Sequence, residues 1–367
     1  MAAQNRPEYR ARMTVSAGDD TLPTDEEIER ALRRAWFPVA RRCDLEQPQR
    51  VNLLGETLVA YLTSDGEPRV VADRCAHRGA SLSDGHVEGD EIVCPYHGWQ
   101  WDGVDGQCVH IPSLGEGAAI PPRAVIAARR AQEQWGLIWC CLDEPAVGLP
   151  APAALDGVEW THGPGRPMRI SAGIRAATEN FRDVAHFPFV HRGTMGHLPQ
   201  VVEPLNVERR DSEVFLTREY SATGGDGGLW QEGMTFSYHA IAPAFVCLRI
   251  AHESGPVRFL LNAPCPHTSP TDPGRPQSTI FWVEGFTHDY TEMTLEEVLE
   301  AEARVYEEDN PILDRIEPGE APLDSSTQVH TPSDRYTLQY RRAFIEFVRA
   351  AGRISAPVAD REPLDVV

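Results

Sequence analysis

The sequence lacks any long apolar run and any excess of positive charge. Its 367 residues include 34 Lys and Arg against 55 Asp and Glu, which gives a formal net charge of −21. That balance repels phosphate backbones and anionic lipid surfaces. No segment approaches the length of a membrane-spanning helix, and the N-terminal stretch has no apolar core typical of a secretory signal. We therefore expect a cytoplasmic protein that binds neither nucleic acid nor membrane.

Cysteine is also scarce. Eight cysteines in a chain of this length are too few for a disulfide scaffold. The dinucleotide-binding pattern G-x-G-x-x-G is missing as well, so we do not expect the chain itself to bind NAD(P)H. What is present is a pair of short segments in which a cysteine and a histidine are close neighbours.

These segments read Cys75-x-His77 and, after sixteen intervening residues, Cys94-x-x-His97. A structural zinc site accepts two cysteines and two histidines. A Rieske [2Fe–2S] centre needs the same side chains, with two thiolates on one iron and two imidazoles on the other. Zinc fingers pair like ligands, whereas here each segment supplies one of each kind. The spacing therefore favours the cluster.

The order of strand and helix signals divides the chain into three parts. Residues 1–35 read as a loosely docked tail and a short helix that starts after Thr24. Residues 36–148 read as short strands separated by Gly, Asp and Pro turns, which predicts an antiparallel β domain. Residues 149–367 combine strands with helices and predict an α+β domain. The helices are expected near 176–187, over 294–309 and near 335–351.

A second group of polar residues lies in the segment 178–197. On a helix, Asn180, Asp183 and His186 fall at i, i+3 and i+6, one polar stripe among apolar residues. A buried polar stripe needs partners, and a metal is one way to supply them. Pro188 is expected to break or kink the helix and so to aim His191 at the same point. Core histidines with ordinary hydrogen bonds are the alternative reading.

Two histidines with an open coordination sphere need one carboxylate to complete a facial triad for non-haem Fe(II). In the helix over 294–309, Asp309 falls on the apolar stripe, while Glu307 points to the opposite side. Pro311 is expected to end this helix just after Asp309. We predict Asp309 as the third ligand, with Glu302 on the same stripe as the alternative.

The motifs C-A-H-R-G-A-S-L, C-P-Y-H-G-W-Q-W-D, E-N-x-x-D-x-x-H-x₄-H and E-E-D-N-P-I-L-D resemble those of the Rieske non-haem iron aromatic-ring-hydroxylating oxygenases. The likeness is to the oxygenase (alpha) component of the monooxygenase and demethylase branch. It implies an all-β Rieske domain, a helix-grip catalytic domain and a homotrimer. It also implies that the Cys–His set binds [2Fe–2S], that His186, His191 and Asp309 bind Fe(II), and that Asp183 connects the two centres between subunits.

The activity implied is that of a terminal oxygenase that hydroxylates or oxidatively demethylates a small aromatic or polycyclic substrate with O₂. Electrons would come from NAD(P)H through a separate ferredoxin or flavin reductase. His239 and Asn262 are expected to orient the substrate. A ring cis-dihydroxylating dioxygenase of the same family is one alternative. A stand-alone Rieske electron carrier and a zinc-stabilised binding protein are others, although a carrier leaves the C-terminal part of the chain unexplained.

Overall fold

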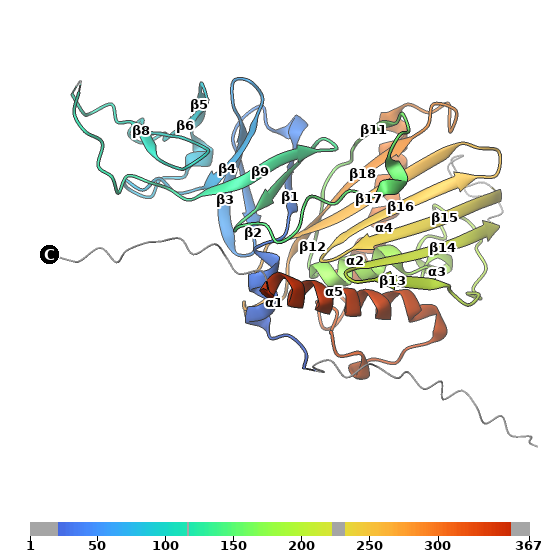
Figure 1. Ribbon diagram of the computed structural model, residues 1–367. Coiled ribbons are helices and arrows are strands. Elements are labelled where there is room, and N and C mark those ends of the chain that lie inside the picture. Colours follow the sequence, from blue (N-terminus) through green and yellow to red (C-terminus); the bar gives the residue numbers. More distant parts are fainter. Residues whose placement is uncertain (1–20, 116, 222–231, 354–367) are drawn as a thin grey trace, which may run out of the picture.

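Strands and tight turns fill the first part of the chain in a computed structural model that describes residues 21–115, 117–221 and 232–353. Most of the expected N-terminal tail, residues 1–20, lies outside the described residues. Six strands form an antiparallel sheet in the order β1-β10-β9-β4-β3-β2 (Figure 1). Their bounds are β1 Phe37–Arg41, β2 Gln49–Leu53, β3 Glu56–Leu62, β4 Pro68–Ala72, β9 Ala128–Gln134 and β10 Leu137–Cys141.

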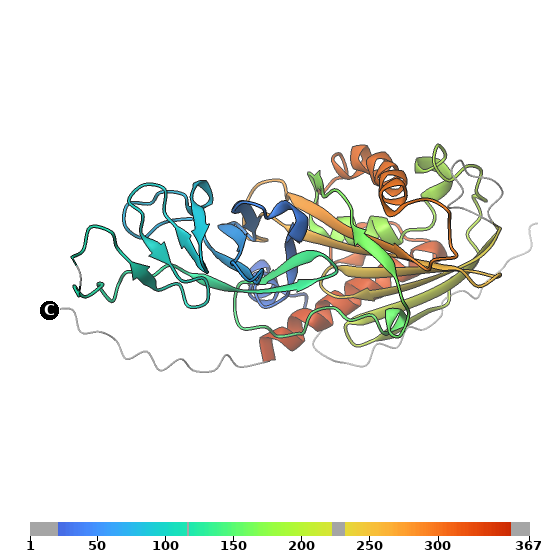
Figure 2. The same cartoon turned by 90° about the horizontal axis from the view of Figure 1, so that it is seen from above.

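A smaller sheet of four strands, in the order β5-β6-β7-β8, completes this part. The strands are β5 His86–Glu88, β6 Glu91–Val93, β7 Gln100–Trp101 and β8 Cys108–His110. Figures 1 and 2 show this sheet at the outer end of the molecule, away from the second part of the chain. The predicted all-β N-terminal domain is confirmed.

The second part is built on an antiparallel sheet of eight strands, in the order β11-β18-β17-β16-β15-β14-β13, with β12 also paired to β18. The strands are β11 Thr161–Pro164, β12 Met168–Ile170, β13 Val207–Arg210, β14 Glu213–Ser221, β15 Glu232–Ile241, β16 Phe245–His252, β17 Val257–Pro266 and β18 Ser278–Phe286. Every residue of β17 and β18 is buried, which is the pattern of strands that are covered on both faces. Sheet plus helices give the α+β domain that the sequence predicts.

The helices are α1 Asp25–Leu32, α2 Ile174–Arg182, α3 Phe187–Val190, α4 Leu295–Leu313 and α5 Arg335–Arg353. Two predicted boundaries were wrong. The helix expected near 176–187 ends at Arg182, and Pro188 lies in the first turn of a separate helix, where a missing N–H costs nothing. Pro311 does not end α4, which continues to the buried Leu313. Packing of the last turn therefore outweighs the backbone hydrogen bond that proline removes.

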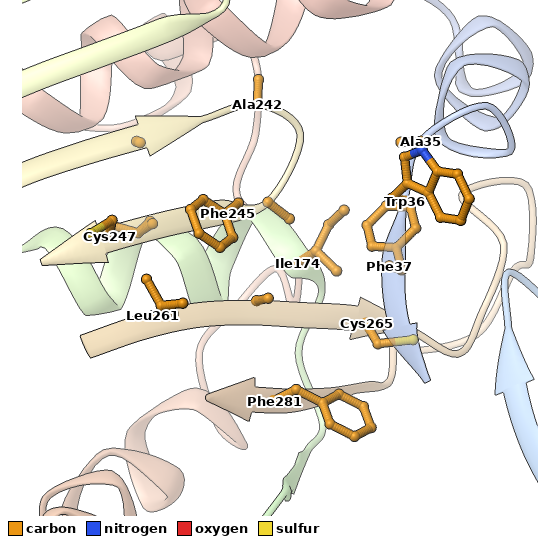
Figure 3. Close-up of a cluster of buried hydrophobic side chains, with 14 of the residues drawn as sticks. Ala35, Trp36, Phe37, Ile174, Ala242, Phe245, Cys247, Leu261, Cys265 and Phe281 are labelled. Carbon is orange, nitrogen blue, oxygen red and sulfur yellow. The ribbon is translucent and has the colours of Figure 1, made fainter. Parts of the chain in front are cut away.

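One hydrophobic core crosses the boundary between the two parts. Trp36 and Phe37 from the first part lie beside Ile174, Phe245 and Cys265 from the second, and all five are buried (Figure 3). Helix α1 also packs against α5. Because these contacts are apolar and continuous, they hold the two sheets in one fixed orientation.

The overall shape is elongated. In both views the four-stranded sheet lies at one end, whereas α3 and α4 lie over the eight-stranded sheet toward the other (Figures 1 and 2). None of the helices in the described part of the chain combines the length and the apolar character needed to cross a bilayer.

Candidate functional site

Two loops with matching backbone hydrogen bonds present the first candidate centre. The N–H of Cys75 donates to the carbonyl of Ala80, and the N–H of Gly79 donates to the carbonyl of Cys75. The second loop repeats both bonds at the same offsets, from Cys94 to Trp99 and from Gly98 to Cys94.

Each of these loops needs a glycine at its fifth residue. Gly79 and Gly98 have φ of 77° and 69°, in the left-handed region that favours glycine. The segments that the sequence singled out are therefore two copies of one turn, each with a buried cysteine at its start.

The side chains of these loops converge in pairs. The rings of His77 and His97 have centroids 4.5 Å apart, and Trp99 stacks on His77 with centroids also 4.5 Å apart. Nδ1 of His77 is buried without a hydrogen-bond partner. Burial, together with the neighbouring Cys94 thiol, raises the pKa of the Cys75 thiol to about 11. A buried thiol pair and a buried imidazole nitrogen of this kind call for a metal partner.

The geometry also separates a cluster from a single ion. Within the described ranges, no three of these four side chains bring their ligand atoms within 4.8 Å of one another. Four ligands of one tetrahedral zinc ion would do so, because metal–ligand bonds there are only about 2.0–2.3 Å long. Two thiols on one side and two imidazoles on the other fit the two irons of a [2Fe–2S] cluster.

Asp73 fixes the first of the two loops. Its fully buried carboxylate accepts from the backbone N–H and the hydroxyl of Ser83, at 2.7 and 2.8 Å, and pairs with Arg50 at 2.7 Å. Because Asp73 directly follows β4 and Ser83 lies beyond the loop, these bonds close the loop at its base.

The second candidate centre joins His186, His191 and Asp309, whose ligand atoms all lie within 4.8 Å of one another. The two Nε2 atoms are 3.0 Å apart, and Oδ1 of Asp309 lies 3.5 Å from that of His186 and 3.4 Å from that of His191. Asn180 donates to the same carboxylate oxygen at 3.1 Å. Two imidazoles and one carboxylate that share one face are the donor set of a non-haem Fe(II) site.

A break in the helix positions these ligands. Helix α2 ends at Arg182, and Oδ1 of Asp183 accepts the N–H of Ala185 at 2.8 Å, a local turn that competes with helix. His186 and His191 are then the residues that flank the four-residue helix α3. The predicted kink is thus a full interruption, and it brings the two rings together.

Burial affects the histidine and the carboxylate of this centre in different ways: it favours the neutral imidazole that binds metal, and it disfavours the carboxylate unless a cation is near. It lowers the pKa of His191, so the imidazole is neutral and free to bind metal. Burial also raises the pKa of Asp309, opposed by the two histidines. A metal ion removes that penalty, and the residues present therefore fit an iron ion.

Glu308 is a functional candidate that sequence reasoning missed. Its Oε2 lies 3.0 Å from Nδ1 of His191 and accepts from the Thr194 hydroxyl at 2.7 Å. A carboxylate on the far nitrogen of a ligand histidine fixes the tautomer and the ring orientation. The sequence shows that Glu308 is next to Asp309, which could have indicated a role at the same centre. Successive residues of a helix point about 100° apart, however, so this position did not suggest a contact with His191.

A cavity opens from this centre into the domain. Apart from the three ligands it is lined by Phe181, Phe187, Met195, Phe236, Tyr238, Leu248, Leu260, Val305, Tyr306, Arg258 and Glu302. Most of these side chains are aromatic or aliphatic, so the cavity suits a small apolar molecule.

The other predicted residues take different places. Glu302, the alternative ligand, is not in the metal group; it lines the cavity and pairs with Arg258 at 3.4 Å. His239 stacks on Phe215 and lies 2.7 Å from Glu213, outside the cavity lining. Asn262 is fully buried and donates to the hydroxyl of Tyr306 at 3.2 Å. A substrate role for either stays a prediction.

Comparisons with known proteins bear on both centres. Residues 35–125 match the Rieske [2Fe-2S] domain, and residues 170–350 match the vanillate O-demethylase oxygenase C-terminal domain. Methylxanthine N1-demethylase NdmA of Pseudomonas putida is 30% identical over 339 residues, 87% of this chain and 90% of that protein. The chain belongs to the Rieske oxygenase family.

A structure of NdmA with caffeine aligns with this Rieske oxygenase at a TM-score of 0.75 and 27% identity, covering 92% of this chain and 99% of that one. The 4beta-methylsterol monooxygenase of Methylococcus capsulatus is 35% identical over 211 residues, 54% of this chain and 55% of that protein. The protein is therefore an oxidoreductase, the oxygenase component of a Rieske monooxygenase, with a Rieske cluster and a mononuclear iron as cofactors.

Proposed function

We propose that this Rieske oxygenase hydroxylates or oxidatively demethylates a small aromatic or polycyclic substrate that binds in the cavity beside His186, His191 and Asp309. The observation that carries the proposal is the aromatic and aliphatic lining that meets the three ligands at one end. Likeness to a methylxanthine N1-demethylase along most of both chains favours N-demethylation in particular. Electrons would come from NAD(P)H through a separate ferredoxin or flavin reductase.

The residues of the cavity would exclude water and orient a flat ring. Phe181 and Tyr306 are stacked with an angle of 10° between their planes and centroids 6.2 Å apart, and both line the cavity. Phe187 closes the wall beside His186, with ring centroids 4.9 Å apart. A flat substrate bound against these rings would present its edge toward the ligands.

The chemistry in the cavity would replace a substrate C–H bond by C–OH: one oxygen atom of O₂ enters the substrate, and the other leaves as water after taking up two electrons and two protons. When bound, the cluster supplies electrons and the iron supplies O₂ activation. If the hydroxylated carbon is an N-methyl or O-methyl group, the new hydroxyl proton passes to the heteroatom and the C–N or C–O bond breaks. The products are then formaldehyde and the demethylated substrate.

The same proposal includes a homotrimer in which the cluster of one subunit serves the iron of the next. His97 is exposed beside Tyr96, which is 65% exposed. At the other end, Phe189 lies between the two ligand histidines in the chain, and Ile312 and Val329 line a hollow together with His186; all three are exposed apolar residues. An exposed apolar surface at each end supports head-to-tail association, which closes into a ring when the rotation allows.

The test supplies the purified, iron-loaded protein with NADH and a surrogate reductase and offers it caffeine and 4-methoxytoluene. The proposal expects formaldehyde in proportion to O₂ consumed, and none from His186→Ala. A cis-diol as the product would favour the dioxygenase alternative. Formaldehyde release that is unchanged in His186→Ala would contradict the proposal.

A further inference from the structure

Three ionisable side chains lie buried at one wall of the cavity, on three different elements. Arg258 of β17 lies between Glu284 of β18, at 3.0 Å, and Glu302 of α4, at 3.4 Å. Arg258 and Glu284 are fully buried and Glu302 is 4% exposed. One cation thus faces two carboxylates, and burial raises the pKa of Glu284 to about 8. Such groups are costly to bury unless each one is paired.

The strand register explains how the three meet. Arg258 pairs with Phe286, and Leu260 pairs with Glu284, so Arg258 and Glu284 point to the same face of the sheet as the cavity residue Leu260. Helix α4 then brings Glu302 to this face. Of the three charged groups, Arg258 and Glu302 line the cavity, whereas Glu284 does not.

The distance between this group and the iron ligands suits a small molecule. Glu302 and Asp309 are seven residues apart on α4 and line the same cavity. Seven residues are two helical turns, or about 10 Å along the axis, so both carboxylates face the same side. A single aromatic ring with a short substituent spans that length.

We infer that Glu302 is a specificity-determining residue, and that it binds a cationic or N–H-donating nitrogen of the substrate while the carbon to be oxidised lies at the iron ligands. The inference rests on the proposed function and names its substrate class. Arg258 already faces two carboxylates, so a substrate anion would meet a shared cation and a nearby negative charge. A protonated amine or an N–H group would instead pair with the Glu302 carboxylate, which lines the cavity and lies farther from Arg258 than Glu284 does, 3.4 Å against 3.0 Å.

The test compares three benzyl compounds of similar shape: N,N-dimethylbenzylamine, which is cationic at neutral pH, neutral isobutylbenzene and anionic phenylacetate. Dissociation constants for the iron-loaded protein are measured from tryptophan fluorescence, because Trp282 stacks on the cavity residue Tyr306 at 5.1 Å. We expect the amine to bind at least tenfold more tightly than either analogue. In Glu302→Gln that preference falls below threefold.

Glu307→Gln is the matched control, because Glu307 lies on the same helix but is exposed and pairs with Arg166. It should keep the full preference. Tighter binding of phenylacetate than of the amine overturns the inference, as does a preference that survives in Glu302→Gln. If Glu302→Gln fails to fold, the ranking of the three compounds by the unmodified protein decides.

The two proposals fail separately. If the amine is not preferred but caffeine or 4-methoxytoluene still yields formaldehyde with O₂, the oxygenase proposal stands and the role of Glu302 is wrong. If the amine binds selectively through Glu302 and no compound is oxidised, the role of Glu302 stands and the oxygenase proposal is wrong.

Discussion

Nε2 of His186 lies 3.0 Å from Nε2 of His191, although the two residues flank opposite ends of α3. Two ligands at right angles around a metal, with bonds of about 2.1 Å, are separated by about 3.0 Å. Asp309 completes the face at 3.5 and 3.4 Å. The spacing of these three groups is therefore that of an assembled facial site.

We expect that the mononuclear iron can be removed by mutation without loss of the cluster. His186→Ala, His191→Ala or Asp309→Ala should each abolish iron binding and turnover, because two ligands from the set hold Fe(II) poorly. The visible spectrum of the Rieske cluster should stay intact. Metal analysis and absorption spectra check this, and full activity in Asp309→Ala would reassign the third ligand.

The converse holds for the cluster. Cys94→Ser or His77→Cys should abolish or shift the visible spectrum while the mononuclear iron remains, since the two ligand sets lie in different domains. The measurements are the spectrum and the ratio of iron to acid-labile sulfide. A colourless protein that holds zinc at Cys75, His77, Cys94 and His97 would contradict the cluster.

Glu308 should tune the iron site without being a ligand. Glu308→Gln removes the charge that faces Nδ1 of His191, and loss of such a partner typically lowers metal affinity about 10- to 100-fold. Titration of the metal-free protein with Fe(II) measures the change. Glu307→Gln, one residue away and exposed, is the control and should leave affinity unaltered.

Glu284 should make the stability of the folded protein depend on pH. Its folded-state pKa of about 8 lies above the ordinary value, so above pH 4.5 the unfolded chain binds fewer protons than the folded one. Stability therefore falls as pH rises, until about pH 8 is passed. His267 acts in the opposite direction only below about pH 6.5, because burial lowers its pKa to about 4.

The pH range from 6.5 to 8 lies above the range in which the folding-linked proton of His267 is released. Across it, the melting temperature of the unmodified protein should decline with rising pH, and in Glu284→Gln the decline should be shallower. Thermal denaturation at fixed ionic strength provides the comparison. If the melting temperatures of the two proteins fall equally with pH, Glu284 is not the buried group that releases its proton in this range.

Much of the fold and of both centres could be predicted from sequence, because the chemistry is local. In each cluster loop the cysteine and the histidine are only two or three residues apart. The spacing of His186 and His191 likewise indicates that their rings can reach one metal. What failed depended on tertiary packing. Pro311 predicts the end of the helix, yet α4 continues to Leu313, whose side chain is buried. The role of Glu302 depends on a strand register that no local pattern contains.

Electron transfer between subunits is the prediction that joins the two centres. The cluster loops and the iron ligands lie toward opposite ends of the elongated chain (Figures 1 and 2). Asp183 has a partly exposed carboxylate, and its Oδ2 lies 3.6 Å from Nδ1 of His186. Because this carboxylate is partly exposed, it can accept a hydrogen bond from another subunit, and we expect the donor to be His97 of that subunit. Asp183→Asn should keep both metals and lose most of the coupled turnover.

Mixed oligomers make the test decisive. A His77→Ala chain has no working cluster, and a His186→Ala chain has no working iron, so each alone should be inactive. In randomly assembled trimers from equal amounts, about one quarter of the interfaces pair an intact cluster with an intact iron. Activity should therefore return to about that fraction of the unmodified value. Mixed trimers that form, as shown by mass spectrometry, yet remain inactive would mean that electrons pass within one chain.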